Sequence, residues 1–61
     1  MKIKIGDIVR MKNVRDPQKV DNTEWVIIDF NHQSVKLKHP SVGGYFVFLR
    51  KNITEVIKEA S

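Results

Sequence analysis

The chain has 61 residues, of which 41% are apolar and 30% are charged, with no cysteine and a formal net charge of +4. A chain of this length folds as one domain, residues 1–61, and buries only about 60% of its unfolded surface, for a stability of roughly 3–9 kcal/mol. These values exclude disulfide bonds and a cysteine-based zinc site, and they leave no room for a pocket that holds a drug-sized substrate.

The first predicted strand, residues 8–12, follows a Gly-Asp pair, and its alternation turns Val9 and Met11 to one face. The composition of the whole chain favours strands, because it has eight valines and seven isoleucines against two leucines and one alanine. A polar loop is predicted at residues 13–23. Loops of this length in small domains are often functional, although an exposed excursion without a ligand explains this loop equally well.

The second and third strands are predicted at residues 24–31 and 34–39, joined by a tight turn at residues 31–34. The predicted register sets apolar side chains opposite apolar ones and acids opposite bases, which is the arrangement that stabilises a hairpin. In that register Phe30 faces Val35, Asp29 faces Lys36, Ile28 faces Leu37 and Ile27 faces Lys38.

The rest of the chain is predicted to hold a turn at residues 40–44, a fourth strand at 45–50, one tight helical turn at 51–53 and a short last strand at 55–58. The fourth strand is expected to pair Leu37 with Phe46 and Val35 with Phe48. The predicted core consists of the inward side chains of these elements: Val9, Met11, Val26, Ile28, Phe30, Val35, Leu37, Phe46, Phe48, Ile53 and Val56.

The opening Gly6-Asp7-Ile8-Val9-Arg10-Met11 resembles the Gly-Asp-x-Val-x-apolar start of many small bacterial barrels of the Src-homology-3-like (SH3-like) type, including KOW-like and Tudor-like ones. The spacing of Phe48, Ile53 and Val56 is similar to the aromatic-to-aliphatic spacing that closes such barrels. The resemblance implies an all-β fold, a small five-stranded SH3-like barrel with one 3-10 turn before the last strand, from a bacterium or a phage. Barrels of this type serve nucleic-acid binding, peptide binding and assembly, and the aromatic loop signature of their proline-binding members is absent here.

No arrangement of residues typical of an enzyme is present, and we expect no cofactor and no small-molecule substrate. Catalysis needs a nucleophile beside a base, or two titratable groups in contrasting environments. The two histidines, His32 and His39, have only Asp29 as a carboxylate nearby in sequence, so no metal site is expected. Gly43-Gly44 lacks the Lys and Ser/Thr that complete a phosphate-binding loop.

The outward face of the second, third and fourth strands is the predicted functional site. In the register above, this face shows Trp25, Ile27, Lys36, Lys38, Tyr45, Val47 and Leu49. Aromatic rings among lysines form a platform on which bases stack while ammonium groups contact phosphates. We therefore predict a module that binds DNA or RNA with little sequence specificity. The predicted contacts are Trp25 and Tyr45 for stacking, and Arg10, Lys12, Lys36, Lys38 and Arg50 for phosphates.

Three alternatives remain open for the same residues. The exposed patch of Trp25, Ile27, Tyr45, Val47 and Leu49 would also suit an interface with a protein partner or with a second copy. A regulatory or adaptor module, encoded by a phage or mobile element, could use the same face or the acidic loop at residues 16–24 against a protein. Strong bending of the strands could also turn Trp25, Ile27 or Leu49 into the core and leave the positive charge to serve solubility.

No signal peptide or membrane span is expected from the distribution of apolar residues. The basic start is not followed by an apolar run of the length found in signal peptides. The longest apolar run, residues 45–49, is far shorter than the about 20 residues that a transmembrane helix needs. The cytoplasm is therefore the expected location.

Overall fold

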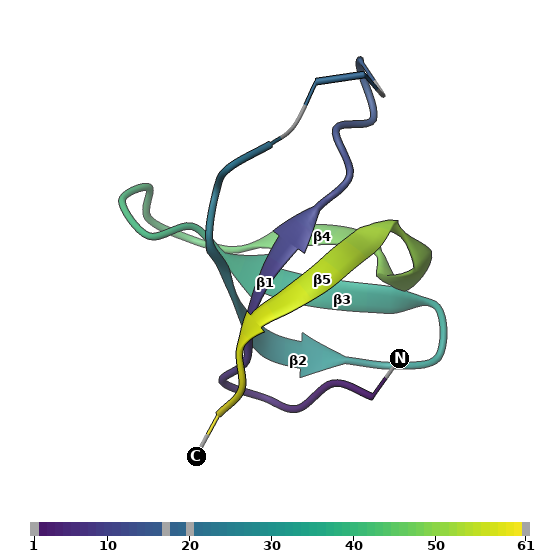
Figure 1. Cartoon of the computed structure of the whole chain (residues 1–61). Coiled ribbons are helices and arrows are strands. Elements are labelled where there is room, and N and C mark those ends of the chain that lie inside the picture. Colours follow the sequence, from purple (N-terminus) through teal and green to yellow (C-terminus); the bar gives the residue numbers. More distant parts are fainter. Residues whose placement is uncertain (1, 17, 20, 61) are drawn as a thin grey trace.

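The computed structural model describes residues 2–16, 18–19 and 21–60, so positions 17 and 20 of the predicted loop lie outside the described residues. The chain forms one antiparallel sheet in the strand order β4-β3-β2-β1-β5 (Figure 1). The elements are β1 (Ile8–Met11), β2 (Trp25–Phe30), β3 (Ser34–Lys38), β4 (Phe46–Leu49), the 3-10 helix η1 (Arg50–Asn52) and β5 (Ile53–Lys58). The predicted all-β fold, with five strands and a helical turn before the last strand, is confirmed.

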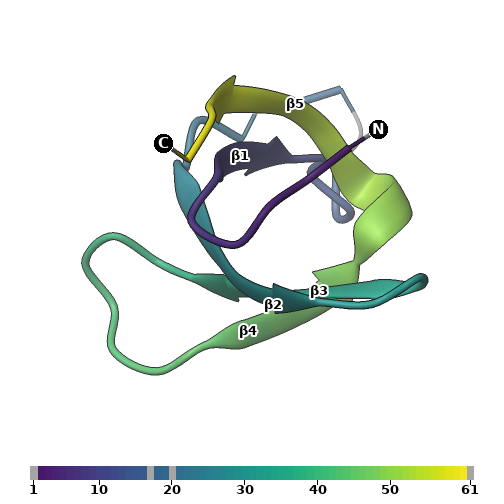
Figure 2. The ribbon, with the colours of Figure 1, turned by 90° about the horizontal axis from the view of Figure 1, so that it is seen from below.

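The sheet is strongly curved, so that β1 and β5 lie across the interior from the part formed by β2, β3 and β4 (Figure 2). Its two edges are β4 and β5, and the sheet is open because these strands do not pair with each other within the described chain. The interior holds the core, which consists of Ile3, Val9, Met11, Trp25, Ile27, Val35, Leu37 and Ile53.

A β-bulge at Ile28 changes which residues of β2 face the core. Next to the turn, at Phe30 and Asp29, the hairpin has the predicted register. On the N-terminal side of Ile28 the pairing is shifted by one residue. The observed pairs are Phe30 with Val35, Asp29 with Lys36, Ile27 with Leu37 and Val26 with Lys38. The predicted partners of Ile28 and Ile27 are therefore wrong. Because successive side chains of a strand point to opposite faces, one extra residue moves the earlier side chains of β2 to the other face.

The bulge buries two side chains that were predicted to lie outward. Trp25 is 7% exposed and Ile27 is fully buried, so the outward prediction is wrong for both. Conversely, Val26 is half-buried and Ile28 is 37% exposed, although both were predicted in the core. The alternative of bending into the core is thus observed for Trp25 and Ile27, whereas Leu49 remains 50% exposed.

The rest of the predicted core is largely confirmed. Buried residues that were predicted are Val9, Met11, Val35, Leu37 and Ile53, and half-buried ones packed against them are Phe30, Phe48 and Val56. The predicted pairing of β3 with β4 is also confirmed. Phe46 lies opposite Leu37, yet it stays 39% exposed because β4 is an edge strand. The prediction missed Ile3, which is 7% exposed, because Ile3 precedes the first strand.

The Gly-Asp pair before β1 ties the two ends of the described chain together. Gly6 has a φ of +97°, a region that side chains disfavour, and a Cβ added there would lie 3.1 Å from the Cβ of Ala60. The buried Asp7 carboxylate accepts hydrogen bonds from the backbone N–H groups of Ala60 at 2.7 Å and Lys4 at 2.9 Å. The Ala60 bond is the main cause that lowers the pKa of Asp7 below 3.8; burial opposes it, and the amide and charge of Lys4 reinforce it.

Candidate nucleic-acid interface

The Trp25 ring lies on the core side of β4. It meets the rings of His39, Phe46 and Phe48 edge-on, at centroid distances of 5.2, 5.4 and 5.2 Å. With 7% of Trp25 exposed, no base has a ring face on which to stack. The predicted stacking position is therefore corrected: Trp25 supports the edge strand from within, as edge-to-face aromatic packing does in protein cores.

Lys36, Lys38 and Tyr45 come together on the outer face of β3 and β4. The two lysines alternate with the buried Val35 and Leu37, and therefore point outward. The ammonium of Lys36 lies 4.5 Å from the centroid of the Tyr45 ring, in a cation–π contact. Because the Tyr45 side chain is 59% exposed, most of this ring is open to solvent.

Two apolar residues, Val47 and Leu49, continue this outer face along β4. They are 60% and 50% exposed, so the prediction that they point outward is confirmed. Val47 pairs with Lys36 across the ladder, and Asp29 is the partner of Lys36 on the β2 side. The sequence between positions 30 and 54 has four basic residues and no acidic one. We call the surface formed by Lys36, Lys38, Tyr45, Val47 and Leu49 the basic-aromatic face.

Arg10 and Lys12 do not join the basic-aromatic face. Arg10 lies on β1, which β2 separates from β3, and its guanidinium forms an ion pair with Glu55 at 2.7 Å. Lys12 follows β1 and lines a hollow of about 240 Å³ in which Lys19 and Asp21 also lie. Arg10 and Lys12, both predicted to contact phosphates, therefore lie among residues of mixed charge. In the sheet, β2 and β3 separate them from the end of β4 that Tyr45 precedes.

Arg50 opens η1, next to the turn between β2 and β3. Its Cζ lies 5.2 Å from the centroid of the Phe30 ring, and its guanidinium donates a hydrogen bond to the carbonyl oxygen of Asn31 at 3.1 Å. The side chain is therefore held against β2 by a cation–π contact and a hydrogen bond, beyond the end of the basic-aromatic face marked by Leu49.

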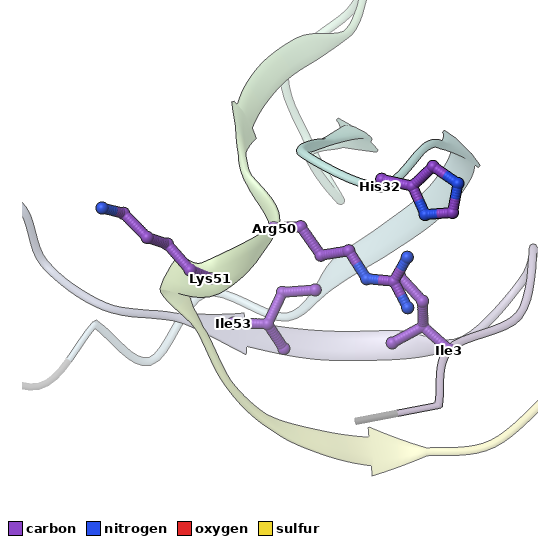
Figure 3. Close-up of a pocket in the computed structure, with 5 residues that line it drawn as sticks. All are labelled: Ile3, His32, Arg50, Lys51 and Ile53. Atoms are coloured by element: carbon purple, nitrogen blue, oxygen red, sulfur yellow. The ribbon is translucent and has the colours of Figure 1, made fainter.

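A basic hollow of about 330 Å³ lies where the β2–β3 turn meets η1. Its lining residues are Ile3, His32, Arg50, Lys51 and Ile53 (Figure 3). The sequence did not predict that His32 and Lys51 line a common hollow, because the turn and η1 are distant in the chain. The fold joins them through the hydrogen bond from the Arg50 amide to the Gln33 carbonyl, at 2.9 Å. Figure 3 shows Arg50 extending toward His32 while Lys51 points away, so the cations do not converge on one point.

His39 shapes the connection from β3 to β4. Its Nδ1 accepts hydrogen bonds from the backbone N–H groups of Ser41 at 3.0 Å and Val42 at 3.1 Å, while its ring packs on Trp25. In the part of the chain that the structure describes, no three His, Cys, Asp or Glu side chains gather as ligands for a metal ion.

Comparison of the chain with protein-family models, with curated proteins and with solved structures finds no match. Over residues 2–16, 18–19 and 21–60, no helix combines the length and the apolar character that crossing a bilayer requires. The physical features of the surface are therefore the grounds on which a function is proposed.

Proposed function

We propose that this chain is a small SH3-like barrel without enzymatic activity that binds DNA or RNA with little sequence specificity through the basic-aromatic face. The strong curvature of the five-stranded sheet, and the 3-10 helix before its last strand, support the barrel part of the proposal (Figure 2). We place the module in the cytoplasm of a bacterium, as a chromosomal or phage-encoded protein.

The observation that carries the proposal is the contact of the Lys36 ammonium with the exposed Tyr45 ring, 4.5 Å away. Lys36 covers one face of the Tyr45 ring, and a base that stacks on the other face would have this ammonium and that of Lys38, the next cation along β3, near its phosphate. Stacking on one aromatic side chain contributes about 1–3 kcal/mol, and it tolerates any base because every base has a π face. Low sequence specificity follows from this chemistry.

The site is smaller than the sequence indicated, since one aromatic residue and two lysines form its centre. Trp25 is buried, and the guanidinium of Arg10 is engaged by Glu55. Each neutralised phosphate releases condensed counterions, so the logarithm of the affinity should fall by about 0.7 per contact for each tenfold rise in salt on single strands. With two lysines in contact we expect weak binding with a shallow, measurable salt slope.

Fluorescence anisotropy of labelled single- and double-stranded oligonucleotides, at two salt concentrations, tests the proposal directly. Tyr45→Ala should weaken binding by about 5- to 150-fold, the equivalent of one lost stacking contact. Lys36→Gln and Lys38→Gln should each lower the salt slope by about 0.7. Lys19→Gln is the matched control, because it removes the same charge from an exposed position in the loop before β2 and should change binding little.

The absence of binding at low salt would overturn the nucleic-acid proposal. An equal loss of affinity for Lys19→Gln and Lys36→Gln would show that binding follows net charge and not the basic-aromatic face. A salt-independent interaction with a protein would instead favour the second candidate function, a protein-contact module. That candidate is supported by the exposure of Tyr45, Val47 and Leu49 in one row.

A further inference from the structure

Within residues 2–16, 18–19 and 21–60, no strand pairs with β4 on the side opposite β3, and the ladder to β3 determines which backbone groups occupy this edge. The Arg50 amide donates to the Gln33 carbonyl, which makes Arg50 and Gln33 a hydrogen-bonded pair of this antiparallel ladder. The pairs that follow in the same register are Leu49 with Ser34, Phe48 with Val35, Val47 with Lys36 and Phe46 with Leu37. Hydrogen-bonded and non-hydrogen-bonded pairs alternate in an antiparallel ladder.

The alternation leaves the N–H and C=O groups of Val47 and Leu49 pointing away from β3, whereas those of Phe46 and Phe48 point toward it. Continued by one more pair, the same register turns the backbone of Tyr45 outward as well. The other side of β3 agrees with this assignment. The Asn31 amide donates to the Ser34 carbonyl, so Ser34 turns its backbone toward β2 and not toward β4.

The side chains of this edge are apolar and uncharged. Tyr45 is 59% exposed, Phe46 39%, Val47 60% and Leu49 50%. No Lys, Glu, Asp, Arg or Pro occurs in residues 45–49 to discourage pairing with another strand. Natural proteins protect an edge strand with such residues or cover it, because an exposed apolar edge otherwise recruits further strands.

The free groups of β4 match those of a second β4 strand placed antiparallel to it about a twofold axis through Val47. In that register Val47 lies opposite its own copy, and Tyr45 lies opposite Leu49 of the other copy. Each of these pairs is of the hydrogen-bonded type, so that every outward N–H and C=O of the three residues finds a partner. On the other face Phe46 lies opposite Phe48, and no charged side chain meets another at the edge.

We propose that this chain forms a homodimer in which the β4 strands of two copies pair antiparallel through Val47, joining the two sheets into one. A second copy is the occupant that the edge fits, because an isologous contact requires a self-complementary surface and residues 45–49 provide one. Edge-to-edge pairing leaves the basic-aromatic face of each copy uncovered, and the faces of the two copies lie side by side. The proposal concerns association of the protein alone and does not depend on nucleic-acid binding.

The size of the contact indicates a weak dimer. Because the outer face stays uncovered, edge-to-edge pairing buries only part of the exposed apolar surface of residues 45–49, and the contact is smaller than the about 1,000 Å² in total that a stable specific interface exceeds. We therefore expect a dissociation constant of about 10–500 μM. Since each copy carries a net charge of +4, added salt should tighten the dimer by screening repulsion, which is opposite to its effect on nucleic-acid binding.

Sedimentation equilibrium of the protein without nucleic acid, from about 5 μM to 1 mM, tests the proposal together with charge variants of Val47. Val47→Lys places two like charges opposite each other at the twofold axis and should weaken the dimer at least tenfold. Val47→Asp should do the same. An equimolar mixture of the two variants should regain association, because only then do opposite charges meet.

The matched control is Val42→Lys, which adds the same charge to a residue that is 51% exposed in the β3–β4 connection, away from the edge. It should leave the dissociation constant within about twofold of the wild type. Far-ultraviolet circular dichroism shows whether each variant is folded. We expect all of them to fold, because the substituted residues are exposed. A wild type that stays monomeric to 1 mM would overturn the proposal. Growth into open-ended oligomers, or a mixture of variants no more associated than either alone, would also overturn it.

Discussion

The two edges of the sheet, β4 and β5, are built in opposite ways. Residues 45–49 carry no charge, and four of their side chains are between 39% and 60% exposed. The β5 edge, in contrast, carries Thr54, Glu55 and Lys58. Charged side chains on an edge discourage pairing with a further strand, whereas an uncharged apolar edge invites it. The difference supports the proposal that β4, and not β5, is the edge that pairs with a second copy.

The two edges also differ in what holds them to the rest of the protein. Behind β4 lies the aromatic cluster of Trp25 with Phe46 and Phe48. β5 is held to β1 by its ladder, by the ion pair of Arg10 with Glu55, and by the hydrogen bond from the Thr54 hydroxyl to the Arg10 carbonyl. Both edges are therefore held by a backbone ladder, to which β4 adds aromatic packing and β5 adds polar side-chain contacts.

The largest expected effect is the loss of the support behind β4. Trp25→Ala should destabilise the protein by about 3–5 kcal/mol, since it leaves a cavity beneath the edge strand. That is a large share of the roughly 3–9 kcal/mol available to a chain of this length, so the variant should be partly or wholly unfolded. Urea denaturation followed by circular dichroism measures the change.

Two control variants sharpen the same comparison. Trp25→Phe keeps an aromatic ring in the cluster and leaves a smaller cavity, so it should cost clearly less than Trp25→Ala. Tyr45→Ala removes an exposed ring from the outer face and should change stability by no more than about 0.5 kcal/mol. Equal effects of Trp25→Ala and Tyr45→Ala would mean that Trp25 does not lie in the core.

Low pH should destabilise the protein through Asp7, whose carboxylate binds the segment that follows β5. The folded protein holds the pKa of Asp7 below its ordinary value, chiefly through the bond from Ala60, which follows β5. The stability that this carboxylate contributes is fully present above about pH 4 and is lost as the pH falls through the folded-state pKa. Urea midpoints measured between pH 2 and 7 should fall on the acid side. Asp7→Asn should flatten that fall, and an unchanged acid limb would contradict this role of Asp7.

A smaller effect is expected at the entry to β4. His39→Leu removes the acceptor of two backbone N–H groups and the ring contact with Trp25, and should cost about 1–1.5 kcal/mol. His39→Asn keeps an acceptor close to the same backbone and should cost less. Thermal denaturation at neutral pH compares the two variants, and a His39→Leu variant as stable as the wild type would contradict these contacts.

The smallest effect concerns the ion pair on β5. The side chains of Arg10 and Glu55 are 35% and 54% exposed, so solvent screens their interaction. A double-mutant cycle with Arg10→Met and Glu55→Gln should give a coupling energy of about 0.2–1 kcal/mol that shrinks in high salt. A coupling above 2 kcal/mol would show that the β5 edge depends on this pair more than its exposure indicates.

The strand order of the hairpins, the register of β3 with β4 and the 3-10 helix could be predicted because each depends on local alternation and turn residues. The bulge in β2 could not. Positions 25–28 read Trp-Val-Ile-Ile, so every residue there is apolar and the alternation that would select a face is lost. Either register buries one isoleucine, so the sequence does not select between them. In the observed register Trp25 packs against Phe46 and Phe48, a contact that depends on the three-dimensional fold.

The candidate site could be predicted in part for the same reason. Lys36, Lys38, Val47 and Leu49 lie on strands with a regular alternation and Tyr45 directly precedes β4, so their outward positions could be predicted. Trp25 lies before the bulge and was placed on the wrong face. His32 and Lys51 belong to a hollow that forms only when the β2–β3 turn meets η1, and no local pattern reports such a contact.

Site-resolved amide hydrogen exchange, at protein concentrations below and above the dissociation constant, tests the role of the β4 edge most directly. The alternation of the ladder predicts that the amides of Val47 and Leu49 exchange rapidly in the dilute protein and become more protected in the concentrated one, in proportion to the fraction of dimer. The amides of Phe46 and Phe48, already bonded to β3, should be protected at both concentrations. Protection of Val47 and Leu49 that does not change with concentration would contradict the pairing of two β4 strands.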